Sequence, residues 1–150
     1  MNKIALFPGS FDPFTLGHQD IVIRSLDLFD KIIIGIGIND NKKRQFSQEE
    51  LIPKIKEVFS GNSKVDTLSY TGLTAEFAKE IGAKYIIRGL RNIADFEYEK
   101  NICQANKYIW EELETVFLMT TPAFSSLSST IIRELYRYGK NVDNFLPYKL

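Results

Sequence analysis

The residues best suited to chemistry are one histidine and a few arginines and lysines, which lie beside glycine-rich or hydroxyl-rich turns. His18 is the only histidine of the chain, and it follows the turn Gly9-Ser-Phe-Asp-Pro13. An imidazole can donate a hydrogen bond to a phosphate oxygen whether it is neutral or charged. A lone histidine near a helix start is more often a surface or capping residue. The neighbouring segments must decide between these two interpretations.

Cationic side chains form the second group of candidates. Asn41-Lys-Lys-Arg44 is a dense positive patch, interpreted either as a solvated loop or as a loop from which Lys42 reaches a phosphate. Arg88 lies in an otherwise apolar stretch, where a guanidinium is costly unless it has a partner, and we expect that partner to be functional. Arg91 adds a second planar fork that suits phosphate oxygens. Together these cations predict a local anion site.

Hydroxyl groups form the third group of candidates. The segment from Thr120 to Thr130 contains more serines and threonines than helix capping requires. With Arg133 one turn later, it predicts a phosphate cradle of hydroxyls and helix-end N–H groups, and an ordinary serine-rich loop is the alternative. Asp95 is interpreted either as a helix cap or dipole partner or as part of the site.

Strand and helix patterns alternate along the chain, and they determine where these groups lie. Apolar runs predict buried strands, and apolar spacings of three and four residues predict helices. Ser47-Gln-Glu-Glu50 has the pattern of a capping box. Gly9 is expected to supply backbone angles that residues with a Cβ avoid. The predicted strands are 4–7, 31–38, 65–70, 85–88 and 115–119, and the predicted helices start after Gly17, at Ser47, at Thr74, at Ala94 and at Ser128-Ser-Thr130.

Five such strand–helix units predict an α/β fold, specifically a Rossmann-like, doubly wound, five-stranded parallel sheet with helices on both faces. Ligands of these sheets bind outside the carboxyl ends of the strands, where the strand order reverses. The turn before His18, the basic patch, the Arg88–Arg91 segment and the hydroxyl-rich segment each follow a predicted strand. The fold is therefore expected to bring them to one edge.

Composition limits the class of protein. The length of 150 residues suits one domain, 1–150, and 19 basic residues balance 19 acidic ones, which argues against a dedicated nucleic-acid binder. The apolar runs are too short for a membrane span, and the N-terminus resembles no signal peptide. The one cysteine, Cys103, fits a reducing compartment and is expected to be a small buried residue. A cytoplasmic protein is expected.

Thr15-Leu-Gly-His18 resembles the T/H-x-G-H signature of the nucleotidyltransferase superfamily. The whole chain closely resembles one enzyme family within it, the bacterial phosphopantetheine adenylyltransferases. The most specific block runs from Arg88 to Glu99. The motifs that carry the resemblance are Pro8-Gly-Ser-Phe-Asp-Pro13, Gly17-His18, Lys42-Lys43, Ile87-Arg-Gly-Leu-Arg91, Ala94-Asp-Phe-Glu-Tyr-Glu99, Val116-Phe-Leu-Met119, Ser128-Ser-Thr130 and Phe145-Leu-Pro147.

The resemblance implies transfer of the adenylyl group of ATP to 4′-phosphopantetheine, which gives dephospho-coenzyme A and pyrophosphate. It also implies Mg²⁺ as cofactor, with no clear carboxylate cage of protein ligands, and a homohexamer. His18 would stabilise the transition state. The residues implied to bind phosphopantetheine are Ser10, Lys42, Thr74 and Arg88. Those implied to hold ATP are Ser10, Phe11, His18, Gly89, Leu90, Arg91, Glu99, Phe124, Ser125, Ser126, Leu127, Ser128, Ser129 and Thr130.

Three positions depart from the family pattern. Ser10 replaces a frequent threonine, Gly72 lies where many members have an acidic residue, and Thr74 lies where a larger apolar residue is common. Two other functions are compatible with the motifs. One is a nucleotidyltransferase with another acceptor, such as glycerol phosphate or nicotinamide mononucleotide, and the other is a non-catalytic nucleotide sensor.

Overall fold

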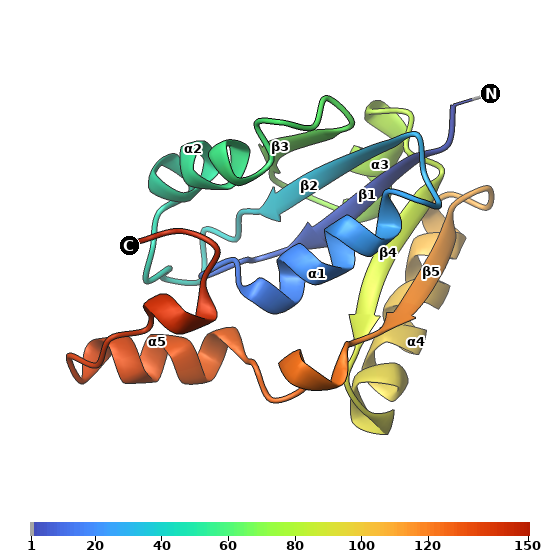
Figure 1. Cartoon of the computed structure of the whole chain (residues 1–150). Helices are drawn as coiled ribbons and strands as arrows, with labels where there is room; N and C mark the ends of the chain where they lie inside the picture. The colour runs from blue at the N-terminus through green and yellow to red at the C-terminus, as the bar shows by residue number, and fades with distance from the viewer. Residues whose placement is uncertain (1) are drawn as a thin grey trace.

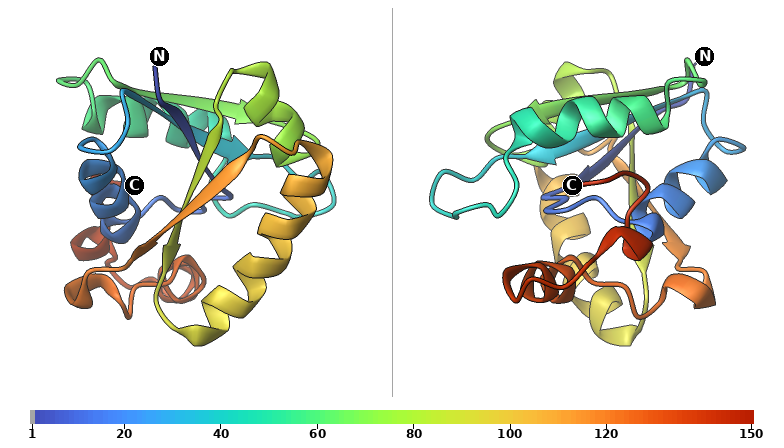
Figure 2. Two further views of the ribbon diagram at one scale, coloured as in Figure 1. Left: turned by 90° about the vertical axis from the view of Figure 1, so that its right-hand side faces the viewer. Right: turned by 60° about the vertical axis from the view of Figure 1, so that its left-hand side comes forward.

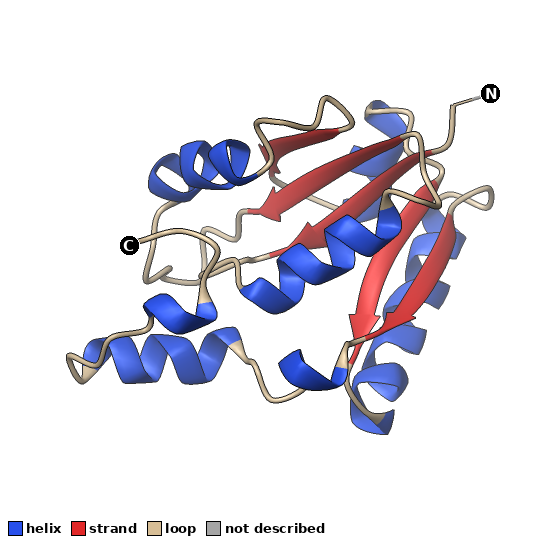
Figure 3. Ribbon diagram, viewed as in Figure 1, coloured by secondary structure: helices blue, strands red, loops and turns tan. Residues whose placement is uncertain are grey.

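The computed structural model describes residues 2–150. It contains a five-stranded parallel sheet in the order β3-β2-β1-β4-β5, flanked by helices (Figures 1 and 3). The strands are β1 (Ile4–Gly9), β2 (Lys31–Gly37), β3 (Val65–Tyr70), β4 (Tyr85–Leu90) and β5 (Glu114–Met119). The α-helices are α1 (Leu16–Ser25), α2 (Gln48–Val58), α3 (Thr74–Glu80), α4 (Ile93–Ile109) and α5 (Ser129–Arg137).

The sheet is doubly wound. β2 and β3 extend it on one side of β1, and β4 and β5 extend it on the other, so the strand order reverses between β1 and β4. Helices α1 and α2 cover one face, and α3 and α4 cover the opposite face (Figures 1 and 2). The predicted fold class is confirmed.

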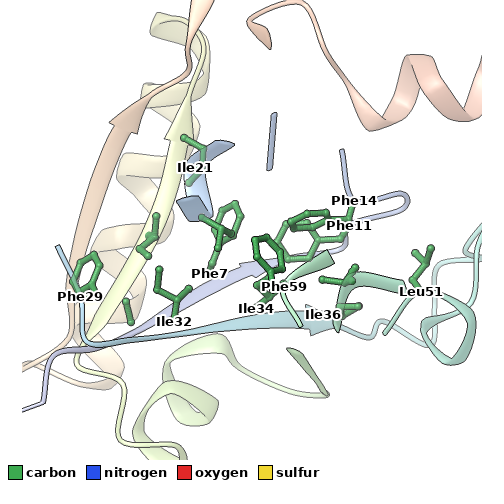
Figure 4. Packing of buried hydrophobic residues seen from close by; sticks show 14 of the residues in the cluster. Phe7, Phe11, Phe14, Ile21, Phe29, Ile32, Ile34, Ile36, Leu51 and Phe59 are labelled. Atoms are coloured by element: carbon green, nitrogen blue, oxygen red, sulfur yellow. The ribbon is translucent and has the colours of Figure 1, made fainter. Parts of the chain in front are cut away.

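Alternating strand residues form two apolar layers because successive side chains point to opposite faces of a sheet. Phe7, Ile32 and Ile34 pack with α1 and α2 (Figure 4). Leu6 and Ile33 belong to the second layer, with apolar residues of α3. Both faces of the central strands are thus buried, as their continuous apolar runs predict.

The ladder between β1 and β4 is short, and this opens the sheet at its carboxyl edge. β1 pairs with β2 along its whole length, to Gly9 opposite Ile36, but with β4 only at Ala5 and Leu6. Beyond Leu6 the two central strands no longer form a ladder. A crevice therefore lies at the point where the strand order reverses, the usual place for a ligand in such folds.

The segment that follows β5 returns to the start of α1 (Figure 2). Ile132 of α5 packs with Val142 and Leu146 in a small third cluster. Tyr148 and Leu150 contact both this cluster and the main core. Residues 146–150 are therefore held by apolar packing beside the turn that leads into α1.

The predicted elements agree with the observed ones to within a few residues, with one local difference. Ser47 caps α2 by accepting a hydrogen bond from the backbone N–H of Glu50 at 3.2 Å, but the return bond of a capping box does not form here between the described residues. Within residues 2–150, no helix is both long and apolar enough to cross a bilayer.

Candidate active site

The turn between β1 and α1 has a different conformation from the predicted one. Gly9 is an extended strand residue, and the left-handed backbone belongs to Phe11, with φ of 44°. Gly9 is required for space instead: a Cβ there would lie 2.9 Å from Cζ of the Phe11 ring. The turn thus folds the Phe11 ring back over Gly9, where only a hydrogen leaves enough room.

His18 lies in the first turn of α1, as predicted, and it closes a capping box. The backbone N–H of Thr15 donates to Nδ1 of His18 at 3.0 Å, and Oγ1 of Thr15 accepts from the backbone N–H of His18 at 3.3 Å. Because Nδ1 accepts a hydrogen bond from an N–H group, the proton of the neutral ring lies on Nε2. His18 is therefore both a capping residue and a donor.

The surroundings of the imidazole keep it neutral. Burial among aromatic rings, with the positive charges of Arg88 and Arg91 adding to the effect, lowers the pKa of His18 from 6.5 to about 3. The Phe11 and Phe14 rings are centred 4.9 and 5.4 Å from the imidazole. At neutral pH His18 is thus an uncharged hydrogen-bond donor.

Two cavities open at the carboxyl edge of the sheet, and they share a wall. The shared residues are Pro8, Gly9, Ser10, Arg88 and Glu99. The first cavity, of about 300 Å³, also contains His18, Gly89, Arg91, Phe124, Leu127 and residues 128–130. The second cavity, of about 410 Å³, also contains Lys42, Tyr70, Thr74, Tyr98, Ile102 and Asn106. Most of the predicted site residues are therefore brought together.

Arg88 finds its partner within the chain. Its Nε donates to Oε2 of Glu99 at 2.9 Å, a second guanidinium nitrogen pairs with the other carboxylate oxygen, and a third contact reaches the carbonyl of Pro8. Glu99 is almost fully buried, at 5% exposure. The functional partner that we expected for Arg88 is thus first of all a buried carboxylate of α4, and the contact of Arg88 with Pro8 bridges the crevice between β1 and β4.

Arg91 and Asp95 form a similar pair at the rim of the first cavity. Nε and Nη2 of Arg91 donate to the two carboxylate oxygens of Asp95, at 3.0 and 3.1 Å. The hydrogen bond from Arg91 lowers the pKa of Asp95. Asn92 is the N-cap of α4, since its side chain accepts from the backbone N–H of Asp95. Asp95 is thus a first-turn dipole partner that also orients Arg91.

The second cavity combines two cations, Lys42 and Arg88, with a partly apolar lining. Lys42 reaches it from the loop after β2, and Ile38, Tyr98 and Ile102 supply apolar surface. Oγ1 of Thr74 is 2.8 Å from the hydroxyl of Tyr70, so its polar atom is already paired. Cys103 is only half-buried and lines this cavity, which corrects the expected burial in the core.

The hydroxyl-rich segment contributes to the first cavity only in part. Ser128, Ser129 and Thr130 line it, whereas Ser125 and Ser126 line neither cavity. The Ser128 side chain caps α5, and the hydroxyl of Ser129 donates to the carbonyl of Pro13 at 2.9 Å. Leu90 also lies outside both cavities, in the apolar interior, although its neighbours Gly89 and Arg91 line the first.

The sequence did not predict the side chains that hold the turn between β1 and α1 by hydrogen bonds to its backbone. Arg44 donates to the carbonyls of Ser10 and Phe11, and Arg133 donates to the carbonyl of Asp12 at 2.6 Å. Arg133 was expected to belong to the phosphate cradle, and Arg44 was noted only as part of the basic patch. Backbone carbonyls leave no signal in a sequence, so these partners become visible only in the structure.

Carboxylates near the site are engaged with arginines. Glu99 pairs with Arg88 and Asp95 pairs with Arg91. Within residues 2–150, histidine, cysteine and acidic side chains form no cluster of three suited to a metal ion. These residues do not form a dedicated cage for Mg²⁺, which takes mainly oxygen ligands and commonly arrives with substrate phosphates.

Comparison with known proteins shows the family of the chain. The cytidylyltransferase-like family model matches residues 6–135. A phosphopantetheine adenylyltransferase of Cytophaga hutchinsonii is 57% identical over 150 residues, which is 100% of both chains. A relative of the same name from Flavobacterium psychrophilum is 49% identical and covers 95% of this chain and 94% of its own.

Solved structures show the same fold at low sequence identity. A bifunctional NMN adenylyltransferase/ADP ribose pyrophosphatase from Francisella tularensis superposes with a TM-score of 0.74 at 17% identity, over 99% of this chain and 46% of that one. This chain thus spans about half of that structure. A putative nicotinate-nucleotide adenylyltransferase from Vibrio parahaemolyticus gives a TM-score of 0.70 at 21% identity, over 97% of this chain and 87% of that one.

Proposed function

The chain belongs to the phosphopantetheine adenylyltransferase family, within the cytidylyltransferase-like proteins, and we propose on this basis how its two cavities perform the reaction. The enzyme transfers the adenylyl group of ATP to 4′-phosphopantetheine, a step of coenzyme A biosynthesis. The products are dephospho-coenzyme A and pyrophosphate.

The observation that carries the proposal is the wall shared by the two cavities. ATP occupies the first cavity, where the N-terminal end of α5, Arg91 and His18 face its phosphates. Phosphopantetheine occupies the second, with its phosphate near Lys42 and Arg88 and its arm along the apolar lining. The two reacting phosphates then meet beside Ser10 and Arg88, which line both cavities.

The reaction is an in-line displacement at the α-phosphorus of ATP. An oxygen of the phosphopantetheine phosphate forms the new P–O bond, and the bond to the departing pyrophosphate breaks. The second pKa of a phosphate monoester is about 6, so the nucleophile is largely ionised and needs no general base. His18 fits this requirement because its Nδ1 is occupied and its Nε2 carries a proton: it donates to the charge that builds on the phosphoryl oxygens.

Magnesium enters this scheme as part of the nucleotide substrate. Because Asp95 and Glu99 are paired with arginines, Mg²⁺ is held mainly by the ATP phosphates. Bound there, the ion would supply positive charge for the leaving pyrophosphate. The protein contributes the alignment of the two phosphates and fixed donors around them.

A homohexamer in the cytoplasm completes the proposal. Exposed apolar side chains near the start of α4 and the end of β5 support self-association, because burial of apolar surface between subunits is favourable. The most exposed are Ile93 at 80%, Tyr98 at 67% and Met119 at 61%. Light scattering at several protein concentrations measures the assembly.

Pyrophosphate release from ATP and Mg²⁺ with different acceptors tests the function. Release with 4′-phosphopantetheine, and none with glycerol phosphate or nicotinamide mononucleotide, is the expected result. Faster release with either of the other acceptors contradicts the acceptor assignment. ATP binding without release from any acceptor indicates a nucleotide sensor and contradicts the assignment as an enzyme.

A further inference from the structure

We propose that Tyr148, far from His18 in the sequence, is a positioning residue that holds the His18 imidazole in its Nε2–H form for catalysis. This inference rests on the proposed function, because it assigns His18 a donor role in adenylyl transfer. The contact that carries it joins residues 146–150 to the turn before α1.

The Tyr148 hydroxyl makes two hydrogen bonds to one residue. It accepts from the backbone N–H of Phe14 at 3.0 Å and donates to the backbone carbonyl of Phe14 at 2.9 Å. Phe14 has no exposed surface. Both backbone polar groups of this buried residue are thus satisfied by a single side-chain oxygen from a distant part of the chain.

The second of these bonds acts on the peptide group that contacts His18. The carbonyl of Phe14 and the N–H of Thr15 belong to the same planar peptide unit, so fixing one fixes the direction of the other. That N–H donates to Nδ1 of His18 at 3.0 Å. The path from the tyrosine hydroxyl to the imidazole is therefore one rigid peptide plane flanked by two hydrogen bonds.

This path determines which ring nitrogen carries the proton. The backbone N–H of Thr15 points at Nδ1 from 3.0 Å, and the Thr15 hydroxyl, 3.2 Å from the same nitrogen, can donate to it as well. A proton on Nδ1 would face the N–H donor, so the neutral ring is protonated at Nε2. The first cavity contains His18, and Nε2 is the ring nitrogen left for a ligand there. Loss of the tyrosine hydroxyl leaves the peptide plane free to tilt and weakens the preference for this form.

Neighbouring side chains hold the peptide groups that precede the one between Phe14 and Thr15, and Ser129 shares the Pro13–Phe14 peptide with Tyr148. Arg44 holds the carbonyls of residues 10 and 11, and Arg133 and Ser129 hold those of Asp12 and Pro13. Among the side-chain hydrogen bonds of residues 2–150, only the one from Tyr148 reaches the carbonyl of the peptide whose N–H contacts His18. Its removal therefore has a specific signature at the imidazole.

Substitution Tyr148→Phe removes the hydroxyl and retains the ring in the apolar clusters. Because His18 is the only histidine, its imidazole nitrogen resonances can be assigned without ambiguity in the ¹⁵N-labelled full-length protein. Tyr138→Phe is the matched control, since Tyr138 is 78% exposed. If Tyr148→Phe does not fold, Tyr148→Met also lacks the hydroxyl and fills the space with a flexible side chain.

The wild type and Tyr138→Phe are expected to show an unprotonated Nδ1 and a protonated Nε2. Tyr148→Phe should shift both nitrogen resonances toward a mixture of tautomers. Its kcat should fall about fivefold to tenfold, less than the roughly 100-fold that a misplacement of about 1 Å can cost, with little change in the KM for ATP.

Unchanged imidazole resonances and unchanged kcat in Tyr148→Phe overturn the proposal, whatever happens to its melting temperature. A protonated Nδ1 in the wild type overturns it as well. A wild-type protein without adenylyl transfer contradicts the proposed function instead, and the resonances of the variant still decide whether Tyr148 positions His18.

Discussion

Arg88 and Glu99 form a two-point ion pair inside the wall that separates the two cavities, with Nε of Arg88 2.9 Å from Oε2 of Glu99. The Glu99 side chain is 7% exposed and the Arg88 side chain 27%. Arg88 therefore reaches both cavities with an orientation that Glu99 fixes. The pair links the stability of the wall to the binding of both substrates.

Substitution Glu99→Gln should destabilise the fold and weaken phosphopantetheine binding together. It leaves Arg88 half-paired, and because this arginine is partly exposed we expect a loss of about 1 to 3 kcal/mol in the free energy of unfolding, below the roughly 3 to 5 kcal/mol of a fully buried pair. Denaturant unfolding and calorimetric titration measure the two effects. Glu97→Gln, on an exposed position of the same helix, is the control. Equal behaviour of the two variants refutes the structural role of the pair.

Gly9→Ala tests the fit of the turn around Phe11. The new Cβ would lie 2.9 Å from the Phe11 ring, which packs on His18. Forcing the ring aside should cost about 1 to 3 kcal/mol of stability and lower kcat. Gly61→Ala adds the same methyl group in open space and should change stability by less than about 0.5 kcal/mol. Thermal melts and steady-state rates compare them, and a neutral Gly9→Ala contradicts the described turn.

The lowered pKa of His18 predicts a pH dependence of stability. Between its unfolded value of 6.5 and its folded value of about 3, the unfolded chain binds a proton at His18 that the folded chain does not. The free energy of unfolding contributed by His18 therefore falls as the pH falls through this window. Urea unfolding at several pH values gives the slope of the free energy of unfolding against pH, and this slope should be shallower for His18→Gln than for the wild type. The difference between the two slopes corresponds to at most one bound proton. Parallel slopes would mean that His18 titrates normally in the folded protein.

The sequence predicted the fold well because buried parallel strands and amphipathic helices have periodic patterns that short segments reveal. It also located His18, since a change of period marks the start of α1. It identified Arg88 as a residue in need of a partner, but Glu99 lies eleven positions away across a strand and a turn, and only the packing of α4 brings it close. The turn braces use backbone carbonyls, which every residue has.

Cavity boundaries were the least predictable feature. Ser125, Ser126 and Leu90 belong to motifs that face the site, yet none of the three lines either cavity. Which member of a motif points inward depends on the angle between neighbouring elements rather than on residue type.

The donor role of His18 is tested most directly by kcat for pyrophosphate release from ATP, Mg²⁺ and 4′-phosphopantetheine, measured for wild type, His18→Ala and His18→Gln. Glutamine at the third helical position can close a capping box, so His18→Gln retains the cap at Thr15 and lacks the imidazole. A donor role for His18 predicts that kcat falls by about 10²- to 10³-fold in both variants, with a melting temperature closer to wild type in His18→Gln. A His18→Gln enzyme with near-normal kcat would contradict it, because His18 would then serve only to cap the helix.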